Sequence, residues 1–211
     1  LPDPDFAITD VGTRISQIID GEWREMSAYA AEIARDWQGH GHEQIQEYLS
    51  LRTELRLQEA SKQSTFKLSY YLNLDVDRES VLSWVESRLR DKGVAASLVW
   101  SIDELENTGL LDVLPRHATK LHAIQFLQQQ LGFQQDEVVF AGDSGNDLAV
   151  LSSAIPAVLV ANASAAIRRQ AQQLAAQNGQ TDALYLATEA DSPLGGNYAA
   201  GILQGVRHFA P

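Results

Sequence analysis

The sequence predicts an α/β protein with a doubly wound parallel-sheet core that carries an inserted α+β cap. Three observations support this fold class. After residue 110, short apolar runs alternate with helical segments, a pattern typical of strands and helices that wind a parallel sheet. Residues 15–110 contain their own mixture of helical and half-buried strand patterns. A short apolar run at residues 6–9 precedes that mixture. We therefore assign residues 1–14 and 111–211 to the core and residues 15–110 to the cap.

Local signals place the first strand and the elements of the cap. The apolar run at 6–9 is followed by Gly12, which indicates a buried strand ending in a turn. Apolar residues then recur at helical spacing up to residue 37, although Gly21 weakens the middle and can divide the stretch in two. Asp77 is a suitable N-cap and Gly93 a suitable stop for one later helix. The predicted elements are a strand at 6–9, helices at 15–37 and 45–60, a half-buried strand at 65–72, a helix at 78–92 and a strand at 94–101.

The C-terminal half alternates strands and helices. Gly132 ends one predicted helix, and Gly142 and Gly145 mark a turn between a strand and the next helix. The predicted elements are strands at 111–115, 137–141, 157–160 and 184–186, and helices at 119–130, 146–153, 164–177 and 198–206.

The composition describes an acidic globular protein. The 211 residues include 16 Lys and Arg and 28 Asp and Glu, which give a net charge of −12 and an isoelectric point near 4.7. Such a surface repels nucleic-acid phosphates and anionic lipid, so we expect no nucleic-acid partner and no membrane partner. The absence of cysteine excludes disulfides and thiolate chemistry. No apolar run approaches the roughly 20 residues of a membrane-spanning helix. We expect a cytoplasmic protein.

The most informative motif is Gly-Asp-Ser-Gly-Asn-Asp at residues 142–147. An apolar strand delivers Asp143 to its carboxyl end, where open α/β sheets bind their ligands. Asp147 follows four residues later, so a compact turn can point both carboxylates into one crevice. Two hard oxygen ligands beside a helix N-terminus suit Mg²⁺ with a bridging phosphate. The alternative is that both aspartates cap the following helix.

This motif resembles the fourth motif of the haloacid dehalogenase (HAD) superfamily of phosphatases, in the branch of sucrose-phosphate phosphatases. Residues 114–120 resemble the third motif, whose lysine precedes a helix, although Leu121 stands where the branch commonly has glycine. Residues 66–70 resemble a strand of the cap, and residues 4–13 resemble a core strand followed by a V-G-T turn. The resemblance implies a Rossmannoid core with a cap.

It also implies Mg²⁺-dependent hydrolysis of a sugar phosphate through an aspartyl-phosphate intermediate. Sucrose 6-phosphate is the first candidate substrate, with mannosylfructose and glucosylglycerol phosphates as alternatives. Two lysines also have simpler interpretations, Lys120 as a solvated lysine at a helix start and Lys67 as an exposed strand lysine. The implied roles are Asp143 and Asp147 at the metal, Lys120 and Asp147 in catalysis, and Lys67, Asn146 and Thr13 in substrate binding.

The superfamily's first motif, D-x-D-x-[TV] after the first core strand, is not found in this chain. That motif carries the nucleophile. The second motif, a Thr or Ser before the V-G-T turn, is also not found. The candidate acidic pairs fail for different reasons: Asp3 and Asp5 follow no strand, Asp75 and Asp77 lie within the cap, and Asp10 has Gly12 at the second position.

Two interpretations account for the missing motif. Truncation would leave the core incomplete at its N-terminus, by two strand–helix units of roughly 30 residues each before Leu1. Alternatively, the chain is a non-catalytic phosphatase-like binding module attached to a sugar-phosphate glycosyltransferase. Both predict that the isolated chain releases no phosphate.

Overall fold

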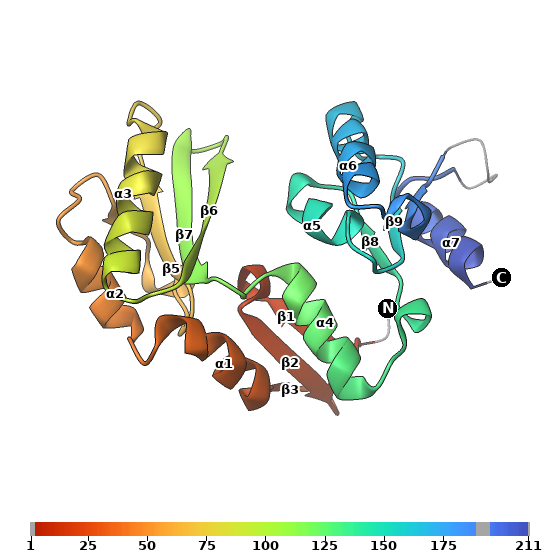
Figure 1. Cartoon of the computed structure of the whole chain (residues 1–211), viewed down its shortest axis with the longest axis horizontal. Coiled ribbons are helices and arrows are strands. Elements are labelled where there is room, and N and C mark those ends of the chain that lie inside the picture. The colour runs from red at the N-terminus through yellow and green to blue at the C-terminus, as the bar shows by residue number, and fades with distance from the viewer. Residues whose placement is uncertain (1–2, 189–194, 211) are drawn as a thin grey trace. The chain divides into compact units, whose positions relative to one another are not determined.

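The structure is a computed structural model that describes residues 3–188 and 195–210. The chain forms two compact units, Leu1–Ala123 and Ile124–Pro211 (Figure 1). Among the described residues, no helix combines the length and the apolar character that crossing a bilayer requires. The assignment of residues 1–14 and 111–211 to one core stays a prediction.

The first unit begins with a three-stranded antiparallel sheet in the order β1-β2-β3, formed by Phe6–Thr9, Arg14–Ile19 and Glu22–Glu25. The prediction of a strand at 6–9 is confirmed. The prediction of a helix over 15–37 is wrong up to residue 25, because Asp20 and Gly21 form a two-residue hairpin turn with φ values of 54° and 78°. Such turns match the twist of antiparallel strands, and Asp-Gly favours them. Helix α1 (Ser27–Ala34) occupies the remainder.

The first unit also contains an α+β lobe. Its antiparallel sheet has the order β4-β5-β7-β6, and it packs against helices α2 (His42–Leu49) and α3 (Arg78–Asp91). The predicted N-cap is confirmed, since the Asp77 side chain accepts a hydrogen bond from the Ser80 N–H. The four strands are Arg56–Leu57, Leu68–Leu72, Ala96–Asp103 and Thr108–Pro115, and the core between sheet and helices includes Trp37, Ile45, Leu68, Leu72, Val85 and Leu111.

Two predicted elements of this region differ from the structure. The helix predicted at 45–60 ends at Leu49, because the next residues turn and Arg56 and Leu57 pair with β5 instead. The strand predicted at 111–115 is the second half of β7, which pairs antiparallel with both β5 and β6. It therefore belongs to the sheet of the lobe. Helix α4 (Lys120–Leu131) follows it closely.

The second unit contains a parallel three-stranded sheet in the order β10-β9-β8, formed by Leu184–Leu186, Ala157–Leu159 and Phe140–Gly142. The central strand β9 packs on both faces. Leu159 joins a cluster with residues of α5 (Leu148–Leu151) and α6 (Ala165–Gln177), whereas Val158 packs with Phe209 of α7 (Tyr198–Phe209). Helices on both faces of a parallel sheet are the doubly wound arrangement that the alternation predicted. The predicted incompleteness of this core stays a proposal.

Candidate active site

The acidic turn follows the end of β8 and is held together by one of its own carboxylates. Asp147 is buried, with 5% of its surface exposed. Its Oδ2 accepts hydrogen bonds from the Asp143 N–H (3.2 Å), the Ser144 N–H (3.1 Å) and the Ser144 hydroxyl (2.8 Å). A Cβ at Gly142 would lie 2.7 Å from the Asp147 Cγ, so this glycine permits the close approach. Asp147 therefore fixes the shape of the turn.

Asp143 faces outward from this turn, and its side chain is oriented by a residue that sequence reasoning missed. Its Oδ2 accepts a hydrogen bond from the Asn162 amide (3.1 Å), whose own oxygen accepts one from the Tyr198 N–H (2.8 Å). Asp143 also lines a hollow of about 250 Å³ together with Val160 and Ile202. Asn162 follows β9, the parallel strand beside β8, at the carboxyl end of the sheet. That position is the signal by which the sequence could have predicted Asn162 as a site residue.

The residues of the turn fit part of a Mg²⁺ site. Mg²⁺ takes six oxygen ligands, few of them from protein, and Asp143 offers an exposed carboxylate at the carboxyl end of β8. Asn146 is exposed on the same turn. Within residues 3–188 and 195–210, no group of three or more metal-binding side chains gathers at one point. Direct ligation of the metal by Asp147 stays a prediction. Its Oδ2 already accepts three hydrogen bonds within the turn.

Replacing Asn162 with alanine should weaken the binding of Mg²⁺. The substitution removes the amide that orients Asp143, and the loss of such supporting contacts typically costs about 10- to 100-fold in metal affinity. We expect the dissociation constant of Mg²⁺, measured by isothermal titration calorimetry, to rise by that factor. Asn178→Ala, which removes a side-chain hydrogen bond to the Ser152 carbonyl, is the matched control. Equal Mg²⁺ affinity in both variants would contradict this role.

Lys120 lies in the first unit, where the V-G-T turn packs against the start of its helix. Gly12 has a φ of 96°, and a Cβ there would lie 2.7 Å from the Thr119 carbonyl carbon and 2.9 Å from the Lys120 nitrogen. The Tyr29 hydroxyl donates a 2.5 Å hydrogen bond to the Gly12 carbonyl. Burial raises the pKa of this phenol, and the Glu32 carboxylate raises it further, so Tyr29 stays a donor. These contacts fix where α4 begins.

Thr13, a predicted substrate contact, is almost completely buried beside this turn. It is 3% exposed, and its hydroxyl donates a 2.9 Å hydrogen bond to the Asp10 carbonyl. That bond holds the turn in shape. Substrate binding by Thr13 stays a prediction.

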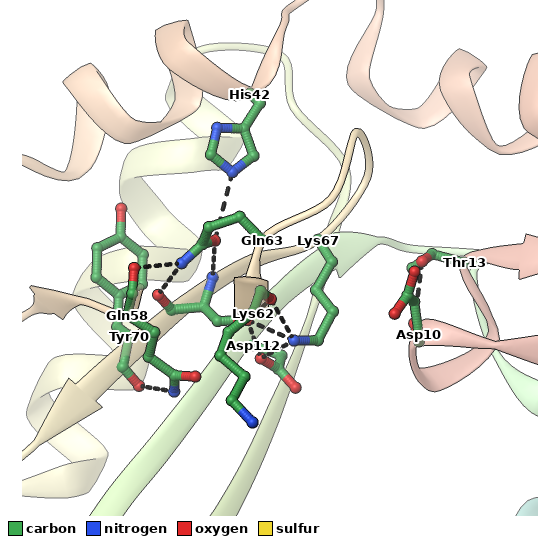
Figure 2. A network of polar contacts seen from close by, with 10 residues as sticks. Asp10, Thr13, His42, Gln58, Lys62, Gln63, Lys67, Tyr70 and Asp112 are labelled. Carbon is green, nitrogen blue, oxygen red and sulfur yellow. Dashed lines mark hydrogen bonds and ion pairs between the residues drawn. The ribbon is translucent and has the colours of Figure 1, made fainter. Parts of the chain in front are cut away.

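Lys67 belongs to a network of polar contacts on the sheet of the lobe (Figure 2). Its Nζ donates to the Ser69 hydroxyl (2.6 Å) and to the Lys62 carbonyl (2.8 Å), and it lies 3.3 Å from the Asp112 Oδ1. The side chain is 12% exposed, so the interpretation as an exposed strand lysine is wrong. An ammonium group has three donors, and three acceptors surround this one. A substrate contact by Lys67, which stays a prediction, would have to replace one of them.

The structure thus divides the predicted residues between its two units. In the second unit, the acidic turn brings together Asp143, Asn146 and Asp147. In the first unit, the V-G-T turn with Thr13 contacts the start of the helix of Lys120, whereas Lys67 lies apart from both in its own network.

A doubly wound unit with an acidic turn after a strand, together with an α+β lobe, matches the architecture of HAD-like hydrolases. Comparison with solved structures agrees. The sucrose-phosphatase of Synechocystis sp., solved in complex with sucrose and phosphate, matches with a TM-score of 0.70 and 25% identity, over 99% of this chain and 75% of that one. A haloacid dehalogenase-like hydrolase protein of Bacillus subtilis shares the fold, with a TM-score of 0.63 and 16% identity, over 98% of this chain and 68% of that one.

The chain belongs to the sucrose-6F-phosphate phosphohydrolase family, whose sequence model matches residues 1–210. This confirms the resemblance drawn from residues 142–147 and 114–120. A protein of Nitrosococcus oceani named as a HAD-like hydrolase is 46% identical over all of this chain, which spans 57% of the length of that protein. The mannosylfructose-phosphate phosphatase of Agrobacterium fabrum is 29% identical over 99% of this chain and 74% of its own length.

Proposed function

We propose that this chain forms most of a Mg²⁺-dependent sugar-phosphate phosphatase whose substrate resembles sucrose 6-phosphate. The observation that carries the proposal is the acidic turn, in which buried Asp147 holds the backbone while Asp143 is left exposed at the carboxyl end of β8. The relatives support this substrate class, since one is named for mannosylfructose phosphate and one was solved with sucrose and phosphate.

In the proposed reaction, this chain contributes the residues that bind the metal and the phosphate, and a segment outside these 211 residues contributes the nucleophile. An aspartate carboxylate attacks phosphorus, the ester oxygen leaves with a proton from a second aspartate, and water then cleaves the aspartyl-phosphate. When bound, Mg²⁺ neutralises charge on the phosphoryl oxygens. Asp143 would hold the ion, Lys120 would offset further negative charge, and Asn146 would contact the phosphate. Phosphoryl transfer depends mainly on such positioning and neutralisation.

We propose that the strand carrying the nucleophile pairs with β8 of the second unit. β8 pairs with β9 on one side and is an edge strand of its sheet as far as the structure describes the chain. Edge strands present unpaired N–H and C=O groups that can pair with a further strand. A strand added parallel to β8 would have its carboxyl end beside Asp143. We therefore propose that the missing D-x-D-x-[TV] motif lies on a segment that pairs with β8.

An assay of phosphate release tests this proposal. The 211-residue chain should release no phosphate from sucrose 6-phosphate with Mg²⁺, whereas the chain extended by the segment encoded before it should do so. Turnover by the unextended chain would overturn the need for an external nucleophile. The nucleophile motif is missing from these 211 residues. If the extended protein also binds the sugar phosphate without hydrolysing it, the alternative of a non-catalytic module attached to a glycosyltransferase is supported.

A further inference from the structure

Asp36 and His117, which are 81 positions apart in the sequence, form a two-point contact close to Lys120. Asp36 lies in the short 3₁₀ helix Arg35–Trp37 that extends α1. Its Oδ2 accepts a 2.7 Å hydrogen bond from the His117 N–H, and its Oδ1 lies 2.8 Å from the His117 Nδ1. A carboxylate only accepts, so Nδ1 carries the donated proton. We call this pair the Asp36–His117 clasp.

The clasp ties together three segments of the first unit. The main-chain carbonyl of Asp36 accepts a 2.8 Å hydrogen bond from the Ala95 N–H, just before β6. The Ala95 carbonyl in turn accepts one from the Arg116 N–H at 3.2 Å, just after β7. The Asp36 side chain is 10% exposed, whereas the His117 side chain is 64% exposed. The chain leaving α1 and the chain leaving the lobe are thereby fixed to each other.

The residues after the clasp lead directly into the lysine helix. The Thr119 N–H donates to the His117 carbonyl at 2.8 Å, and the Thr119 hydroxyl oxygen accepts from the His122 N–H at 3.1 Å. The position of His117 therefore constrains the first turn of α4, together with the packing of Gly12 against Thr119. A second residue of α1 also lies beside this turn, since Glu32 Oε1 is 2.7 Å from His122 Nε2.

We propose that Asp36 is a positioning residue for Lys120. Asp36 acts through His117 and the start of α4. This proposal rests on the proposed function of Lys120 in neutralising a phosphoryl group. The reason is geometric. A misplacement of a catalytic group by about 1 Å can cost about 100-fold in rate, and groups placed on rigid elements lose that accuracy when their supports are removed.

Kinetics of the extended protein test this role. Asp36→Ala should lower kcat for sugar phosphate by about 10- to 100-fold, with KM changed far less, because Lys67 and Asn146, the other proposed substrate contacts, are left in place. Asp36→Asn, which keeps one acceptor oxygen for the His117 N–H, should recover part of the rate. Asp75→Ala removes an exposed carboxylate of the lobe and should match the unmodified protein. If Asp36→Ala and Asp75→Ala have the same kcat, the positioning role is overturned.

Hydrogen–deuterium exchange of the same proteins gives a second measurement that needs no turnover. The amides of residues 117–123 should exchange faster in Asp36→Ala than in Asp75→Ala, with Asp36→Asn between them. Unchanged exchange at these amides would overturn the clasp even if the enzyme is active. Faster exchange in a protein that hydrolyses no sugar phosphate would instead overturn the proposed function and leave the clasp supported.

Discussion

Replacing Asp143 with asparagine in the extended protein should lower Mg²⁺-dependent phosphate release by about 10³-fold, because the variant loses the exposed negative charge that would hold the ion. The fold should survive, since asparagine keeps an oxygen that can accept the Asn162 hydrogen bond. Thermal unfolding should therefore change little. The measurement is the initial rate of phosphate release across a range of Mg²⁺ concentrations.

Asp136→Asn is the matched control for this experiment. Asp136 is an exposed carboxylate of the same unit, and it lies before β8, away from the acidic turn. The two variants change the net charge equally, so a general electrostatic effect would appear in both. A rate close to that of the unmodified protein in Asp143→Asn would refute the assignment of Asp143 to the metal.

Replacing Gly12 with alanine should destabilise the first unit by roughly 3 kcal/mol. The residue has a φ of 96°, a conformation that costs a residue with a side chain about 1–2 kcal/mol. Its new Cβ would also overlap the backbone of Thr119 and Lys120, and overpacking adds about 1–3 kcal/mol. Urea unfolding measures the loss as a lower midpoint at an unchanged slope.

Gly21→Ala separates these two contributions. Gly21 also has a positive φ, 78°, but nothing lies within 4 Å of the added Cβ. We expect a loss of about 1–2 kcal/mol there, from backbone strain alone. Equal losses in the two variants would show that Gly12 does not pack against the start of α4.

Local patterns predicted those elements whose signals lie within a few residues. Helix α3 has its N-cap Asp77 and its positive-φ stop Gly93, and both function as predicted. The β2–β3 hairpin was missed because Ile15, Ile18 and Ile19, which all lie in β2, also have the spacing of a helix face. The Asp-Gly turn decides in favour of the hairpin, which leaves Trp23 60% exposed.

Contacts between residues far apart in the sequence were beyond prediction from local patterns. Strand β7 belongs to the sheet of the lobe because it pairs with β5, some forty residues earlier. The spacing of Asp143 and Asp147 predicted one shared turn, which the structure has. It did not predict that one carboxylate is buried in the turn and the other exposed, because that depends on which backbone N–H groups the turn directs inward.

The hydrogen bond between Asn162 and the Tyr198 N–H links the C-terminal helix thermodynamically to the acidic turn. Helix α7 packs through Phe209 on Val158 and Val160, and its first residue is bonded to the same amide that orients Asp143. Linkage is reciprocal, so whatever binds at Asp143 in its oriented form also stabilises the docking of α7. The stability with which α7 docks therefore depends on whether a ligand is bound at the acidic turn, some fifty residues earlier in the sequence.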